Sequence, residues 1–176
     1  WNDFSKIIDN IDTVYFAGGE PFVQEGHYKL LLKLIDHGAT NVKLRYNTNL
    51  SYKKFKNYDL KELWKHFDVR EWPSIDGYGD RVEYSRKGLD WKTFEENIEH
   101  YRDYLESLSV VSSVYTISSL PDLIKWIKDR GLNFHITNLT FPYELSSTII
   151  PTDSKKEVMY KFRETLRKVG LSDYEK

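Results

Sequence analysis

Apolar residues recur at helical spacing in several stretches of the chain. Tyr28, Leu31 and Ile35 lie three or four residues apart, so the pattern predicts a helix that buries one face. Gly38 follows this stripe, at a position where helices commonly end. The same spacing predicts further helices over residues 4–11, 59–67, 90–108, 123–131 and 158–170.

Five runs rich in β-branched and aromatic residues lie between these stripes and predict strands. Their apolar residues follow one another rather than alternate with polar ones, which is typical of strands covered on both faces. The third run is the least regular, because Pro73 has no N–H to donate to a neighbouring strand. A loop rich in glycine and charge is predicted over residues 77–88. The predicted strands are Thr13–Ala17, Val42–Tyr46, Val69–Asp76, Val110–Ser118 and Phe134–Leu139.

Strands that alternate with helices indicate a parallel sheet, because parallel strands need crossovers of a dozen or more residues. The fold class is therefore predicted as α/β with parallel strands. An open doubly wound sheet and a partial barrel of the TIM type produce the same pattern, and periodicity does not separate them. The 176 residues fit a single domain, since domains commonly run to about 100–200 residues.

Composition narrows the classes of function. Lysine plus arginine number 26 against 27 aspartate plus glutamate, a net charge of −1, which argues against a large nucleic-acid footprint. No apolar run reaches the ~18 residues of a membrane span, and the first residues show no signal peptide, so we expect a cytoplasmic protein. The absence of cysteine excludes disulfides and thiolate-ligated metal sites within the chain.

Small and polar residues close each predicted strand. In parallel α/β folds, ligands bind at the carboxyl ends of the strands, so these residues predict a cleft for a polar small molecule. They are Gly18–Pro21, Asn47–Asn49, Ser74–Gly77, Ser118–Ser119 and Asn138.

The most informative of these segments is Gly18–Pro21. Its two glycines remove the Cβ obstruction, so backbone carbonyls could approach a ligand closely. Glu20 adds a negative charge suited to an ammonium group, and Pro21 suits the start of a helix. An ordinary strand-to-helix turn is the alternative, because glycine and proline are common in turns.

Three segments in register resemble the radical S-adenosylmethionine (SAM) superfamily. Thr13–Pro21 resembles its second strand and GGEP motif, and Leu44–Asn49 is similar to its third strand. Ser74–Gly77 and the charged loop after it are similar to the fourth-strand region of the SPASM/twitch branch. The resemblance implies a (β/α)6 partial TIM-like barrel over residues 1–140, with its first βα unit missing, and a C-terminal extension over residues 141–176.

The resemblance also implies roles in binding SAM. Gly18, Gly19 and Glu20 would receive the methionyl ammonium, since backbone carbonyls and a carboxylate accept hydrogen bonds from a group that only donates. Ser74 and Asp76 would bind the ribose hydroxyls, because residues two apart lie on one side of a strand. Without the resemblance, this second pair would only end a strand in an Asx turn.

Three further residues receive roles in the same way. Arg86 would pair with the methionyl carboxylate, to which a planar guanidinium is suited, and Arg81 in the same loop is the alternative. Asn47 and Asn49 would line the cleft near the sugar or the substrate. The competing interpretations are a solvated charged loop and ordinary turn asparagines.

The family's chemistry depends on a 4Fe–4S cluster that the cysteines of a CxxxCxxC loop hold. SAM binds to that cluster, and its cleavage yields a 5′-deoxyadenosyl radical. This sequence has no cysteine, so the cluster would belong to a parent protein only. We therefore assign no catalytic residue and no metal ligand, and expect weak or no SAM binding and no turnover from this chain.

Three functions stay open. The chain is the barrel of a radical SAM enzyme, or a degenerate barrel that serves as a peptide-binding or structural module, or an unrelated α/β enzyme whose strand ends match by chance. Phe141–Pro151 resembles a segment that approaches the substrate side in twitch-type members, which favours a peptide-like substrate. We also expect self-association, since a missing first strand would leave an uncovered sheet edge.

Overall fold

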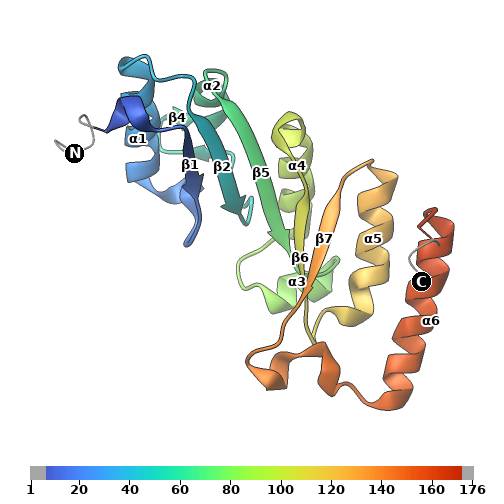
Figure 1. Cartoon of the computed structure of the whole chain (residues 1–176). Helices are drawn as coiled ribbons and strands as arrows, with labels where there is room; N and C mark the ends of the chain where they lie inside the picture. The colour runs from blue at the N-terminus through green and yellow to red at the C-terminus, as the bar shows by residue number, and fades with distance from the viewer. Residues whose placement is uncertain (1–6, 172–176) are drawn as a thin grey trace. The chain divides into compact units, whose positions relative to one another are not determined.

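Five parallel strands form the main sheet of the computed structural model, which describes residues 7–171 (Figure 1). They are β1 (Thr13–Phe16), β2 (Lys43–Thr48), β5 (Asp68–Ile75), β6 (Leu108–Ser112) and β7 (Phe134–Asn138). Every neighbouring pair is parallel, so the predicted α/β class with parallel strands is confirmed. The strand order β1-β2-β5-β6-β7 follows the chain, without the reversal that marks a doubly wound sheet.

Helices connect these strands, as the periodicity predicts. The helices are α1 (Glu25–Asp36), α2 (Leu60–Trp64), α3 (Asp80–Ser85), α4 (Trp91–Tyr101), α5 (Leu120–Asp129) and α6 (Thr152–Lys168). Among the described helices, none is both long enough and apolar enough to cross a membrane.

The predicted helix over residues 4–11 is represented by one 3-10 turn, η2 (Ile8–Asn10), and its first half lies outside the described residues.

The remaining elements are short. A hairpin of β3 (Lys54–Phe55) and β4 (Tyr58–Asp59), which the sequence pattern did not predict, forms a separate antiparallel pair. The further 3-10 turns are η3 (Pro21–Val23), η4 (Arg102–Tyr104), η5 (Ile117–Ser119), η6 (Tyr143–Leu145) and η7 (Ser147–Ile149).

The described chain divides into two compact units, each built from two separate stretches of sequence. The first unit comprises residues 7–73 and 93–106, and the second comprises residues 74–92 and 107–171. The chain therefore passes from one unit to the other three times, and the first passage lies within β5.

Buried aromatic rings hold the first unit together. Tyr46 of β2, Trp64 of α2 and Tyr101 of α4 are fully buried. The ring centroid of Trp64 lies 5.1 Å from that of Tyr46 and 5.2 Å from that of Tyr101. Burial of one large apolar side chain contributes roughly 1.5–3 kcal/mol, so this cluster joins a strand to two helices that are distant in sequence.

The core of the second unit is mainly aliphatic, with the buried ring of Trp126 as an aromatic member. Leu120, Leu123, Ile124 and Ile127 of α5 are buried, as is Val110 of β6. In contrast, α6 packs beside α5 and yet has no fully buried side chain. Helix α6 is thus covered less completely than α5.

Buried and more exposed side chains alternate along β2 and β5, so the prediction that both faces are covered is wrong. In β2, buried Leu44 and Tyr46 alternate with exposed Lys43 and half-buried Arg45 and Asn47. Each strand therefore packs one face in the core and leaves the other less covered. The alternation is visible in the sequence of β2, where polar residues take every second position.

The predicted strand Val110–Ser118 ends too late. Strand β6 stops at Ser112, because the chain then turns and the N–H of Ile117 donates to the carbonyl of Ser113 (2.9 Å). Ser118 therefore belongs to the 3-10 turn η5 that leads into α5.

Two helical boundaries also differ from the predictions. The predicted loop over residues 77–88 contains α3, which begins after Gly79 and buries Val82. The helix predicted to reach Leu108 ends as α4 at Tyr101 and continues as the turn η4, while Leu108 starts β6. A single apolar anchor in a short charged helix produces too little periodicity to predict it.

Candidate functional site

The glycine pair of the first unit follows directly after β1. Gly18 and Gly19 have φ angles of +80° and +60°, a left-handed conformation that other residues adopt only with strain. Both residues are exposed, and neither carbonyl accepts a backbone hydrogen bond from another described residue. The pair forms a turn with accessible acceptor groups at the carboxyl end of a parallel strand.

The buried carboxylate of Glu20 joins the ends of β1 and β2. Its Oε1 accepts hydrogen bonds from the Thr48 hydroxyl (2.7 Å) and the Phe22 amide (3.2 Å). Its Oε2 accepts one from the Asn49 amide (2.8 Å). A carboxylate offers about four lone-pair sites, so one on Oε2 is left for a ligand. The role in joining two strand ends was not predicted, because Thr48 lies far from Glu20 in sequence.

The two asparagines near the end of β2 differ in their contacts. Asn49 Oδ1 accepts from the Ser51 amide (3.0 Å), which is the Asx turn of an ordinary turn residue. The side chain of Asn47 is half-buried and makes no hydrogen bond with another described residue. Of these two asparagines, Asn47 therefore keeps all the donors and acceptors of its side-chain amide for a ligand.

In the second unit, Asp76 and Arg86 form a bidentate ion pair. Arg86 Nε donates to Asp76 Oδ2 (2.6 Å), and an Arg86 terminal nitrogen donates to Asp76 Oδ1 (3.2 Å). The side chain of Asp76 is 20% exposed and that of Arg86 is 28% exposed. Arg81 of α3 points elsewhere, since it is exposed and makes no such contact. Arg86, not Arg81, is thus the partner of the strand-end carboxylate.

Gly77 allows the chain after β5 to pack closely against the start of α5. A Cβ atom at Gly77 would lie 2.9 Å from Ser119 Oγ and 3.1 Å from Thr116 Cβ. Ser119 Oγ accepts from the Tyr78 amide (3.2 Å) and donates to the Thr116 carbonyl (2.9 Å). Ser119 therefore lies at a helix start rather than at a strand end. The sequence indicates this start by Pro121, since proline is common in the first turn of a helix.

Hydroxyl and amide side chains occupy the carboxyl ends of the last two strands. The Ser112 hydroxyl of β6 donates to Asn138 Oδ1 of β7 (2.6 Å), so Asn138 lies at a strand end as predicted. Ser113 Oγ lies 3.1 Å from Thr116 Oγ1. Ser112, Ser113 and Thr116 are buried, whereas Asn138 is exposed. Because these side chains are paired with one another, they are structural groups of the second unit.

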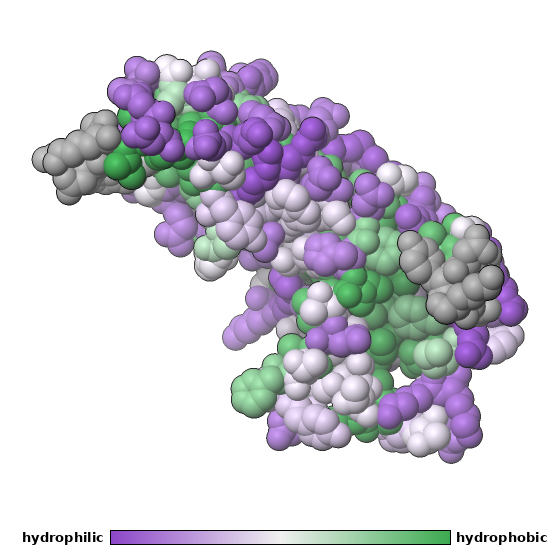
Figure 2. Space-filling view, viewed as in Figure 1, coloured by the Kyte–Doolittle hydropathy of each residue, from purple (hydrophilic) through white to green (hydrophobic). Residues whose placement is uncertain are grey.

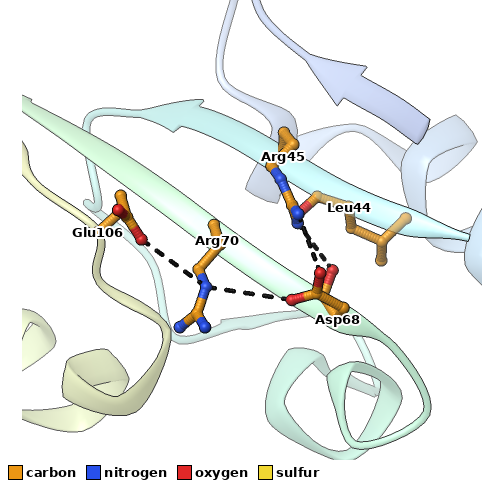
Figure 3. A network of polar contacts seen from close by, with 5 residues as sticks. All are labelled: Leu44, Arg45, Asp68, Arg70 and Glu106. Carbon is orange, nitrogen blue, oxygen red and sulfur yellow. Dashed lines mark hydrogen bonds and ion pairs between the residues drawn. The ribbon is translucent and has the colours of Figure 1, made fainter.

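A charged network lies on the less covered face of the first unit (Figure 3). Arg45 donates to the carboxylate and the carbonyl of Asp68 (2.9 and 3.0 Å). Arg70 Nε lies 4.0 Å from Asp68 Oδ1 and 3.7 Å from Glu106 Oε2. The network occupies the first half of β2 and β5, away from their carboxyl ends, so it stabilises the sheet rather than contributing to the candidate site.

Two buried ionisable groups of the first unit were not predicted as notable. Glu71 of β5 is fully buried, and neither of its carboxylate oxygens has a hydrogen-bond partner among the described residues. Burial, together with the charge of Glu20, raises the pKa of Glu71 well above its usual value. Burial lowers the pKa of His27 to about 4, and the Nε2 atom of this ring is hydrogen-bonded to the Tyr46 hydroxyl (2.8 Å).

The structure thus forms two groups from the predicted site residues. Glu20 and Asn49 meet within the first unit, next to Gly19, and Asp76 and Arg86 meet within the second. Ser74 lies in the last part of β5, two residues before Asp76. Among residues 7–171, no cluster of three or more histidine, aspartate or glutamate side chains is arranged to hold a metal ion.

Comparisons with known proteins add no relative: the chain matches no family model and no curated protein.

Proposed function

We propose that the chain is the SAM-binding portion of a radical SAM enzyme, folded as a partial (β/α)6 barrel of the TIM type. The observation that carries the proposal is positional: Gly18–Pro21, Asn47–Asn49 and Ser74–Gly77 each fall at or just after the carboxyl end of a parallel strand. Ligands of parallel α/β folds bind at these ends. A strand order that follows the chain supports the barrel over the doubly wound sheet.

The acceptors of the first unit suit the amino group of SAM. The carbonyls of Gly18 and Gly19 are accessible, and Glu20 Oε2 keeps one lone-pair site. An ammonium group only donates hydrogen bonds, so this acceptor-rich turn is complementary to it. Asn47 adds an uncommitted amide at the end of the neighbouring strand.

The groups of the second unit suit hydroxyls and a carboxylate. The Ser74 hydroxyl and the Asp76 carboxylate lie two residues apart along the chain, a spacing that fits two vicinal ribose hydroxyls. Arg86 already neutralises Asp76. Ligand binding at this position would therefore share or replace that ion pair, which predicts a modest affinity.

The iron–sulfur cluster does not fit this chain. The sequence has no cysteine, and cluster iron is bound by thiolates. We therefore derive no radical step from these residues, and the proposed role is SAM binding alone. A peptide-like substrate is proposed on the resemblance of Phe141–Pro151, in which Phe141 and Tyr143 are exposed.

Titration with S-adenosylhomocysteine tests the proposal without the cluster. We expect weak, millimolar binding that shifts the NMR signals of the Gly18, Gly19 and Asn49 amides and of residues 74–77. Asp76→Asn should weaken binding about tenfold, because a hydrogen bond to a charged group contributes roughly 1.5–3 kcal/mol. Asp80→Asn, an exposed carboxylate on α3, is the matched control and should leave the affinity unchanged.

Two results would contradict this proposal. One is the absence of shifts at the two groups of residues at millimolar ligand. The other is equal binding by the parent chain and Asp76→Asn when circular dichroism shows both to be folded.

A non-catalytic, peptide-binding or structural barrel is the second candidate. It is favoured by the internal pairing of the predicted ligand groups, since Glu20 accepts three hydrogen bonds and Asp76 holds Arg86. The coding sequence upstream of Trp1 distinguishes the candidates. A CxxxCxxC motif within about 40 residues, roughly one βα unit, supports the enzyme, and an upstream region without it supports the second candidate.

A further inference from the structure

Two adjoining hollows lie beside α6 in the second unit. Their volumes are about 310 and 450 Å³, within the usual range of roughly 300–1,000 Å³ for small-molecule sites. Ile117, Ile150 and Val158 line both hollows, so the two form one continuous groove, which we call the α6 groove. Figure 2 shows hydrophobic side chains gathered beside α6 in this unit.

One end of the α6 groove is almost entirely apolar. Met159 and Phe162 of α6 line it in addition to the three shared residues. Its polar groups are the side chains of Ser147 and Lys155, and Lys155 Nζ already donates to the Thr148 carbonyl (2.8 Å). Met159 is 50% exposed, so apolar surface at this end stays in contact with water.

The other end of the α6 groove adds charged side chains, with a cationic excess, to a lining that still contains Val114, Ile149 and Pro151. Arg81, Lys161 and Glu157 line it, together with two serine hydroxyls. Lys161 Nζ lies 2.9 Å from Glu157 Oε1, and this contact lowers the pKa of Glu157. Arg81 makes no hydrogen bond or ion pair with another described residue. The guanidinium is therefore the one charge at this end without an internal counter-ion among the described residues.

We propose that the α6 groove binds a fatty acid, with its carboxylate at Arg81 and its alkyl chain along Met159 and Phe162. A guanidinium matches a carboxylate in geometry and charge. An alkyl chain needs no hydrogen-bond partner, whereas the amide groups of a bound peptide would be left unpaired at the apolar end at a substantial cost. The alkyl chain would also cover the apolar side chains of Val158, Met159 and Phe162 on α6.

The fatty-acid site is independent of the proposed SAM site. It uses none of the residues assigned to SAM and lies wholly within the second unit. Loss of one activity therefore leaves the other measurable.

The single methionine of the chain provides a direct probe. A carbon-13 methyl label on methionine marks Met159 at the apolar end, apart from any initiator methionine added for expression. Decanoate, kept below its micellar concentration, should shift this signal saturably in the full chain. Affinity should rise roughly fourfold per methylene from hexanoate to decanoate, as expected for burial of alkyl groups. Acetate should produce no shift.

Head-group and charge variants test the other end. Arg81→Ala should weaken decanoate binding about tenfold, as expected for loss of a charged hydrogen bond. Arg167→Ala removes an exposed arginine of α6 that does not line the groove and should change binding less than twofold. Decanol should bind about tenfold more weakly than decanoate.

Three outcomes would overturn the proposal. They are equal binding of decanol and decanoate, equal binding by the parent chain and folded Arg81→Ala, and tighter binding of decyl phosphate or of a short acidic, apolar peptide than of decanoate. Decyl phosphate would indicate a phospholipid head group, and the peptide would indicate a protein partner.

Discussion

The carboxyl group of Glu71 lies in the aromatic core of the first unit. It is opposite Tyr46 in the β2–β5 ladder, and directly opposed residues on parallel or antiparallel strands place their side chains on the same face. Burial and the nearby charge of Glu20 raise its pKa, so the neutral acid is the form that the core accommodates. A buried ionised carboxylate without partners costs several kcal/mol.

Glu71→Gln should therefore stabilise the chain at alkaline pH. A raised folded-state pKa means that the contribution of the neutral acid is fully present below the unfolded value near 4.5 and is lost as the pH rises through the folded value. We expect Glu71→Gln to raise the free energy of unfolding near pH 8 by about 1 kcal/mol or more, with little gain near pH 4.

Denaturant unfolding of both proteins across this pH range measures the difference. Glu62→Gln is the matched control, because Glu62 is exposed and forms a surface ion pair with Lys65. A wild-type stability that follows the same pH profile as Glu71→Gln would show that Glu71 ionises freely in the folded chain.

Single residues were predicted well where the signal was local and poorly where it was long-range. The positive φ angles of Gly18 and Gly19 agree with the turn that the sequence predicts. The hydrogen bond between Glu20 and Thr48 was not predictable, because it spans 28 residues. Likewise, no periodicity distinguishes Glu71 from other glutamates. Its raised pKa results from burial in the folded chain.

At the scale of elements, the packing of the loop after β5 against the chain that leads into α5 depends on the missing side chain of Gly77. Gly77→Ala should destabilise the second unit by about 1–3 kcal/mol, since the new methyl group would overlap Ser119 and Thr116. The same substitution at Gly26, within α1, meets no atom within 4 Å. Gly26→Ala should stabilise the chain by about 0.5–1 kcal/mol through helix propensity.

Thermal unfolding of the two variants measures both effects. The same glycine-to-alanine change should lower the stability at Gly77 and raise it at Gly26. This difference separates the effect of a steric contact from that of helix propensity. A Gly77→Ala protein as stable as the parent would mean that the loop and η5 move apart without cost.

Element types were predicted more reliably than element ends. The five strands and the helices α1, α5 and α6 carry strong periodicity and were all found, although the end of β6 and the start of α6 each lie six residues before their predicted positions. The end of β6 was missed because Ser113–Ser118 carries β-forming residues, while hydrogen bonds between hydroxyls and backbone bend it into a turn. Local side-chain competition of this kind leaves no periodic signal.

At the scale of the whole molecule, the main sheet ends in two strands without charged residues. β1 and β7 each pair with one neighbour within the described residues. Natural edge strands usually carry lysine, proline or a bulge that prevents pairing with another chain. Neither Thr13–Phe16 nor Phe134–Asn138 contains such a residue, so we expect concentration-dependent association.

Tyr15→Lys should reduce that association if β1 is the edge that pairs, and Ile136→Lys should do so if β7 is. Both side chains are exposed, so the added charge leaves the core intact. Sedimentation velocity over two decades of concentration measures the effect, with Tyr84→Lys on exposed α3 as control. A parent chain that remains monomeric throughout would contradict the expectation.

The interleaving of the two units has a consequence for synthesis. A ribosome releases residues 74–92 before residues 93–106, so part of the second unit leaves the exit tunnel while the first still lacks α4 and its Tyr101 ring. The two units therefore cannot fold one after the other from the N-terminus, as tandem domains do. A chaperone that binds the nascent chain would encounter both units while they are incompletely folded.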